Sequence, residues 1–190
     1  MAYKTKIANN ASSCNQDIFE VNGLNISNDV SEVIKDFPYW IQMYIPETLK
    51  IPSQKPDIET INSIDISVDI IKQQIIVTPI STTENLEGKT LSGRKLIVEG
   101  VLCQKIEYTA ALSQQSVHSA HFYVPFSAYI VVPSEINFTK EDERIITMDS
   151  LNVNFKVNVC IEDVCVCTVD NRTILKQVTL LLYAIPSQGC

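Results

Sequence analysis

Residues 151–161 read LNVNFKVNVCI, a stretch in which apolar and polar side chains alternate at every position. Successive side chains of a β-strand point to opposite faces, so a period of two predicts a strand with one face in the core. A helix would need apolar residues three or four positions apart, which this stretch lacks. The most regular part of the sequence therefore predicts a β-strand.

The same alternation recurs along most of the chain. Ile, Val and Thr make up 56 of the 190 residues, against 8 Ala, and branched side chains pack well on pleated sheets. Seven or eight strands with polar turns between them predict an all-β, two-layer antiparallel sandwich with jelly-roll or Greek-key connections. The other predicted strands cover residues 64–70, 75–79, 94–108, 122–132, 164–169 and 173–183.

The region before these strands has a different character. Residues 1–25 are polar and rich in Asn and Ser, and they predict a flexible N-terminal arm in front of one domain over 26–190. Apolar residues at helical spacing predict a short helix over Asp29–Asp36, which Pro38 ends. Four prolines make 37–56 an irregular connection or an edge segment.

Charge and hydropathy exclude several classes of partner. Lys and Arg number 15 against 22 Asp and Glu, a net charge of −7, which disfavours phosphate neutralisation and hence nucleic acid. No apolar run approaches the roughly 20 residues that cross a bilayer, so we expect no membrane partner. The first residues hold no apolar stretch of the kind found in a secretory signal, so we expect synthesis and retention in a cytoplasm.

Six cysteines are unexpected in such a compartment, where thiols stay reduced. Strand parity places Cys103 and Cys160 on faces with charged and amide side chains, and puts Cys165 and Cys167 on one common face. A hairpin turn is predicted at Glu162–Asp163, which would bring Cys160 opposite Cys165 at a separation that suits a disulfide.

The cysteines allow three interpretations. They are incidental thiols, they hold zinc, or they form disulfides, at least some of them between chains. The spacing Cys165-Val-Cys167 is CxC and lacks a second close pair, which disfavours zinc. We favour disulfides, because cysteines near both ends of a chain suit links between copies. The candidates, intramolecular or between subunits, are Cys14, Cys103, Cys160, Cys165, Cys167 and Cys190.

Signs of catalysis are lacking in the sequence. His118 and His121 are three positions apart, which puts them on opposite faces of a strand, where they cannot share a metal or a substrate. Glycine is scarce, and neither phosphate-binding glycine motif occurs. Residues 141–144, EDER, predict a solvated turn. We therefore expect no enzyme, no catalytic residue, no cofactor and no metal site.

Seven segments, taken together and in order, resemble the SPOCS domain, a family of sporulation and spore-surface proteins of clostridial-type endospore formers. The resemblance runs from about Tyr39 to Ala184. The segments are KIPSQKPDIETI (50–61), NLEG (85–88), GRKLIVEG (93–100), QKIEY (104–108), QSVHSAHFYVPF (115–126), IEDV (161–164) and VTLLLYA (178–184).

The resemblance implies a non-enzymatic role in the spore envelope. Some family members are adaptors in which a peptidoglycan-binding LysM module follows the domain, and others look like cysteine-rich building blocks of the exosporium or of spore appendages. Because the sequence ends soon after Ala184, we expect a self-assembling building block, cross-linked by disulfides into a fibre or a layer. The alternative is an adaptor that docks a partner during envelope assembly.

A spore building block also implies a location and partners. The protein would be made in the mother-cell cytoplasm without a signal peptide, deposited on the spore surface and oxidised when that cell lyses. Its partner would be further copies of itself, together with other spore-surface proteins.

Overall fold

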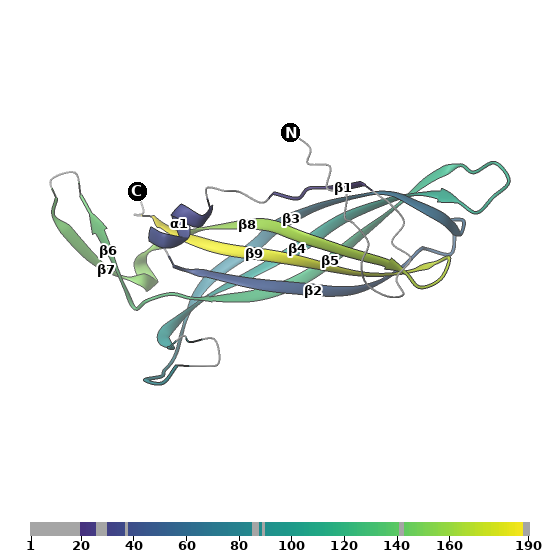
Figure 1. The fold of residues 1–190 in the computed structure, drawn as a ribbon. Coiled ribbons are helices and arrows are strands. Elements are labelled where there is room, and N and C mark those ends of the chain that lie inside the picture. Colours follow the sequence, from purple (N-terminus) through teal and green to yellow (C-terminus); the bar gives the residue numbers. More distant parts are fainter. Residues whose placement is uncertain are drawn as a thin grey trace.

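Two sheets face each other across an apolar core (Figure 1). The computed structural model describes residues 20–25, 30–36, 38–84, 88, 90–140 and 143–187. A four-stranded sheet has the order β1-β3-β4-β5, a three-stranded sheet the order β2-β9-β8, and β6 and β7 form a separate hairpin. In chain order the elements are β1 (Glu20–Asn22), α1 (Val30–Asp36), β2 (Trp40–Lys50), β3 (Ile58–Ile80), β4 (Ser92–Ala110), β5 (Val117–Val131), β6 (Glu135–Thr139), β7 (Ile145–Asp149), the 3₁₀ turn η1 (Ser150–Asn152), β8 (Asn154–Thr168) and β9 (Thr173–Ser187).

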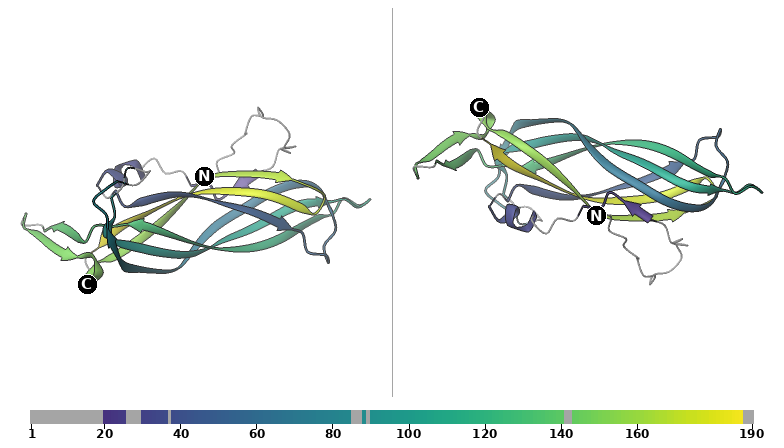
Figure 2. Two further views of the ribbon diagram at one scale, coloured as in Figure 1. Left: turned by 90° about the horizontal axis from the view of Figure 1, so that it is seen from below. Right: turned by 90° about the horizontal axis from the view of Figure 1, so that it is seen from above.

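The predicted β-sandwich is therefore confirmed. Strands β3, β4 and β5 are joined by successive antiparallel hairpins, and β9 pairs with β8 on one side and β2 on the other. The sandwich is elongated, and the β6–β7 hairpin projects from one end of it (Figure 2). The predicted short helix is present as α1.

Alternation along the strands builds the core. Inward residues of β4 and β9 are fully shielded from solvent, while their outward neighbours are at least partly exposed. Burying a branched or aliphatic side chain of this size contributes roughly 1.5–3 kcal/mol. Residues with no exposed surface on the strands of both sheets include Ile64, Val98, Leu102, Ile106, Ile130, Ile174, Val178, Leu180 and Leu182.

Two of the predicted strands form a single continuous strand in the structure. Residues 64–70 and 75–79 both lie in β3, which runs for 23 residues without a turn. The alternation breaks between them because the register against β4 shifts between Ile70 and Lys72. Such a bulge inserts an extra residue into a strand and exchanges its two faces while pairing continues.

The hairpin predicted at Glu162–Asp163 is wrong for the same reason. Strand β8 continues through these residues, with a register shift between Ile161 and Asp163 against β9. Before the bulge Phe155 and Ile161 are buried, and after it Val164 and Val166 are buried. The polar pair therefore marks an exchange of faces and not a reversal of the chain.

The ends of other elements also differ from the prediction. Segment 37–56, expected as an irregular connection or edge segment, contains β2, which forms one edge of the three-stranded sheet. Leu151 is not in a strand: it lies in η1, where Asp149 accepts a hydrogen bond from its backbone N–H, and its side chain is 48% exposed. The hairpin of β6 and β7 was not predicted.

Arg172, in the turn between β8 and β9, fastens one end of the sandwich. Its guanidinium forms an ion pair with Asp57 and donates hydrogen bonds to the backbone carbonyls of Ile51 (3.2 Å), Pro52 (2.7 Å) and Lys55 (3.1 Å). One side chain thus joins the β8–β9 turn to the connection between β2 and β3.

Candidate functional site

Cys103 lies on the outward face of β4, in the same parity as Lys105 and Glu107, as the alternation predicts. Its thiol donates a hydrogen bond to a carboxylate oxygen of Asp69 at 3.5 Å. Burial, and then the hydrogen bond and negative charge of Asp69, raise the pKa of this thiol. The thiolate, which is the nucleophile in disulfide exchange, is therefore disfavoured at this position.

The three cysteines of β8 differ in their exposure. Cys165 is exposed, and Cys167 on the same face is half-buried. Cys160 points away from the core, yet only 5% of it is exposed. Among the residues that the structure describes, no two cysteines are joined by a disulfide. Because β8 does not turn at Glu162, Cys160 and Cys165 do not face each other across a hairpin.

Two of the disulfide candidates, Cys14 and Cys190, lie outside the described residues, as does most of the predicted arm. The histidines fall on opposite faces of β5: His118 stacks on the ring of Tyr108, whereas His121 is exposed. Within the described ranges, no three His, Cys, Asp or Glu side chains gather where they would hold a metal ion.

The end of the predicted arm, residues 20–25, lies on the sandwich. Strand β1 adds to the edge of β3 in parallel, with Glu20 beside Ser63 and Asn22 beside Asp65. The side-chain amide of Asn22 donates a hydrogen bond of 2.8 Å to the Asp65 carboxylate. Gly23 follows with a φ of +103°, and a Cβ atom there would lie 2.0 Å from the carbonyl oxygen of Ile66. Only glycine fits this close approach.

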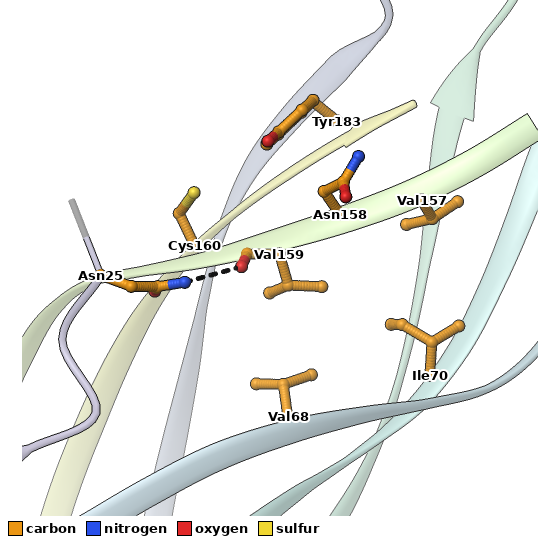
Figure 3. Close-up of a pocket in the computed structure, with 8 residues that line it drawn as sticks. All are labelled: Asn25, Val68, Ile70, Val157, Asn158, Val159, Cys160 and Tyr183. Carbon is orange, nitrogen blue, oxygen red and sulfur yellow. Dashed lines mark hydrogen bonds between the residues drawn. The ribbon is translucent and has the colours of Figure 1, made fainter. Parts of the chain in front are cut away.

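Asn25 then crosses to the other sheet (Figure 3). Its backbone N–H donates to the carbonyl of Ile161 at 3.2 Å, and its side-chain oxygen accepts from the N–H of Ile161 at 2.6 Å. Its side-chain amide also donates to the carbonyl of Val159 at 3.1 Å. We call residues 20–25 the clasp, because they bind the edge of β3 and the edge of β8 together.

An open pocket of about 650 Å³ lies beside the clasp, at the seam between β3 and β8. Figure 3 shows four valine and isoleucine side chains on one side of β8 and Cys160 with Tyr183 on the other. The lining has no charged side chain. The residues that line it are Asn25, Val68, Ile70, Val157, Asn158, Val159, Cys160 and Tyr183.

A second polar feature lies inside the core. Glu47 of β2 and Lys176 of β9 are opposite each other in the three-stranded sheet, and Gln104 projects from β4 of the other sheet. The Gln104 amide nitrogen donates a hydrogen bond of 2.7 Å to Glu47 Oε2, and the Lys176 ammonium lies 3.7 Å from the same oxygen. We call these three side chains the core triad.

The core triad is closed off from solvent. The side chains of Lys176 and Glu47 are 0% and 2% exposed, and Gln104 is buried. Burial lowers the pKa of Lys176 to about 8, although the charge of Glu47 acts in the opposite direction. Among the described residues, Lys176 Nζ, Glu47 Oε1 and Gln104 Oε1 have no hydrogen-bond partner.

The core triad is not among the predicted site residues, although part of its signal is visible in the sequence. Gln104 occupies an inward position between Leu102 and Ile106, and Lys176 occupies one between Ile174 and Val178. A polar residue at a core position of an otherwise apolar face is a departure that needs a partner. Glu47 lacks this signal, since it lies among the prolines of segment 37–56.

Comparison with known protein families confirms the resemblance to the SPOCS domain. Residues 57–166, more than half of the chain, match the family model described as SipL, SPOCS domain. No curated protein and no solved structure matches the chain. In the described part of the chain, no helix has the length and apolar character to span a bilayer. The chain belongs to the SPOCS-domain family and is a sporulation-related protein.

Proposed function

We propose that the protein is a non-enzymatic, self-assembling structural protein of the bacterial spore surface. Its SPOCS domain supports a role in sporulation. The observation that carries the self-assembly is the docking of the clasp, in which the chain's own N-terminal segment adds to a sheet edge and reaches across to the second sheet. Further copies of the same chain are therefore its partners.

The contacts of the clasp are of a kind that a neighbour can supply. Strand β1 binds β3 through backbone pairing over three residues, and Asn25 binds the backbone of β8. Strand addition gives affinity through the main chain, so the clasp of a second copy would find the same partners on the same edges. Exchange of clasps in one direction joins copies head to tail, and such contacts form a fibre if they do not close into a ring.

Disulfides between copies would make these contacts covalent. Among the cysteines that the structure describes, Cys165 is best placed to form a disulfide with a neighbouring copy, because it is exposed on the outer face of the edge strand β8. Cys160 is poorly placed, because it is buried. Cys14 precedes the clasp in the sequence and would be carried to a neighbour with it. Cross-links of this kind lower the rate at which subunits leave a polymer.

Electrophoresis with and without reductant tests the proposal. The oxidised, concentrated protein should give a ladder that survives boiling in detergent and vanishes with reductant. Cys165→Ser should weaken the ladder, whereas Cys160→Ser, its buried control on the same strand, should not. Deletion of residues 1–25 should leave a folded monomer and no polymer in electron micrographs. A monomer in both lanes for the intact chain would overturn the cross-linking, and the absence of any polymer in its electron micrographs would overturn self-assembly and favour the adaptor role.

A further inference from the structure

The core triad places an amine, a carboxylate and a carboxamide together in the interior of the sandwich. Each comes from a different strand, and β4 lies in the opposite sheet from β2 and β9. Apolar side chains that are fully buried lie next to these residues on the same strand faces, among them Leu102 and Ile106 on β4 and Ile174 and Val178 on β9. Reactive groups are thus held in a site that is closed off from bulk solvent and that the sheets fix in place.

Stability alone does not explain such a cluster. Removing a lysine and a glutamate from water costs several kcal/mol per ion, and apolar side chains of similar size are often as stable or more so. Three polar atoms of the triad also lack hydrogen-bond partners among the described residues, although buried polar atoms are normally paired. The arrangement therefore points to chemistry and not only to packing.

The three groups have complementary reactivities. With a pKa of about 8, the Lys176 amine is uncharged in about one molecule in ten at pH 7 and in about half at pH 8, and an uncharged amine is a nucleophile. The carboxamide of Gln104 is an acyl donor whose leaving group is ammonia. Glu47 Oε2 contacts both nitrogen atoms, which is the position of a group that moves a proton from one to the other.

We propose that Lys176 and Gln104 join in an intramolecular isopeptide bond, with Glu47 as the proton carrier. The lone pair of Lys176 Nζ attacks Gln104 Cδ, and a bond forms between them. Glu47 takes a proton from Nζ and delivers it to Gln104 Nε2. The bond between Cδ and Nε2 breaks, and ammonia leaves. An amine and a primary amide give a secondary amide and ammonia, so no oxidant, cofactor or external energy source is needed.

The bond would link the two sheets through their centre. Lys176 belongs to β9, the middle strand of the three-stranded sheet, and Gln104 belongs to β4, an inner strand of the other. The two sheets could then no longer separate completely, whatever the redox conditions. The inference concerns the inside of one subunit and does not depend on the proposed self-assembly between copies.

Intact mass spectrometry of the full-length, reduced protein tests the proposal. After incubation at pH 8, the mass should be lower than the sequence mass by about 17 Da, the mass of one ammonia. Protease digestion should yield a branched peptide that joins residues of β4 to residues of β9. A folded protein that keeps the full sequence mass overturns the proposal, and folding is checked by circular dichroism on the same sample.

Variants test whether the loss of ammonia requires Lys176 and Glu47. Lys176→Met and Glu47→Gln should both retain the full mass, whereas Lys156→Met, at an exposed lysine of β8, should lose ammonia like the original chain. The sequence Asn22–Gly23 can also lose ammonia, by forming a succinimide. A loss that persists in Lys176→Met, or that maps to Asn22 with no branched peptide, overturns the assignment. The branched peptide of the unsubstituted chain decides the question even where a variant does not fold.

Discussion

The side chain of Asn25 accepts a hydrogen bond of 2.6 Å from the backbone N–H of Ile161, a residue 136 positions away in the sequence. This bond ties the N-terminal segment to the edge of β8, after the same segment has paired with β3. The clasp, which precedes the β3–β4 and β8–β9 hairpins in the chain, therefore closes the seam between the two sheets at this point. Asn25 thus adds polar contacts to a seam that Gln73 of β3 also bridges, by donating a hydrogen bond to the carbonyl of Phe155 in β8.

Replacement of Asn25 should release the clasp. Asn25→Ala removes both side-chain hydrogen bonds to β8 and leaves the N–H of Ile161 without that acceptor, at a cost of about 2 kcal/mol. Hydrogen exchange at Ile161 should accelerate, and denaturant unfolding should report the loss. Asn158→Ala is the matched control, because Asn158 lines the same pocket and is half-buried, but donates its hydrogen bond to the carbonyl of Lys156 on its own strand. Equal losses in both variants would contradict this account of the clasp.

Removal of the Asp69 charge should make Cys103 more reactive. Since the carboxylate of Asp69 helps to raise the pKa of the Cys103 thiol, Asp69→Asn should bring that pKa closer to its ordinary value. More thiolate then forms at a given pH, and alkylation of Cys103 at pH 8 should be several-fold faster. The measurement is the pH dependence of iodoacetamide labelling, followed by peptide mass spectrometry under reducing conditions. Asp163→Asn, on the other sheet, should leave the labelling of Cys103 unchanged.

Arg172 should contribute more to the free energy of unfolding than its ion pair with Asp57 alone does. Arg172→Met removes the ion pair with Asp57 and three hydrogen bonds to backbone carbonyls, and we expect a loss of about 3 kcal/mol. Asp57→Asn removes the charge and one of two acceptor oxygens, which bind Arg172 and Asn171, but leaves the three carbonyl contacts of Arg172, and it should cost about 1 kcal/mol. Denaturant titration of both variants and of their combination measures the coupling. An equal cost for the two single variants would show that the carbonyl contacts contribute nothing.

The stability of an unlinked core should rise with pH. In Gln104→Leu, which cannot form the isopeptide bond, Lys176 still titrates. Its folded-state pKa of about 8 lies below the ordinary value of 10.5. Between these values the unfolded chain binds more protons, so the free energy of unfolding increases with pH, by at most about 3 kcal/mol. The reference is the double variant with Lys176→Met, measured at the same pH values. A difference that does not change from pH 7 to pH 10 would contradict the lowered pKa.

Local patterns in the sequence account for most of the fold. The alternation in 151–161 predicts β8, and the apolar positions from Leu96 to Ile106 predict the inward face of β4. The same patterns could not distinguish a bulge from a turn at Glu162–Asp163, since both interrupt the alternation with polar residues. The choice depends on β9, which is long enough to pair with β8 on both sides of the interruption.

For the core triad, the sequence indicates buried polar residues but not their contact with one another. Lys176 and Gln104 each break an apolar series, so the sequence does indicate that each needs a buried partner. It does not indicate that they share one, because the contact depends on how two sheets stack and on the pairing of β2 with β9. The clasp was missed for a similar reason: three residues are too few for a period to be visible.

The bulge in β8 decides which atoms of this strand meet water. Upstream of Glu162 the odd-numbered side chains fill the interior, and downstream the even-numbered ones do. Were Glu162 to take a position of its own in the ladder, so that no bulge formed, the alternation would continue in phase, and Cys165 and Cys167 would point into the core with Val164 and Val166 turned outward. The bulge, and not the chemistry of the cysteines themselves, thus sets whether oxidants and neighbouring molecules can reach the sulfur atoms of Cys165 and Cys167.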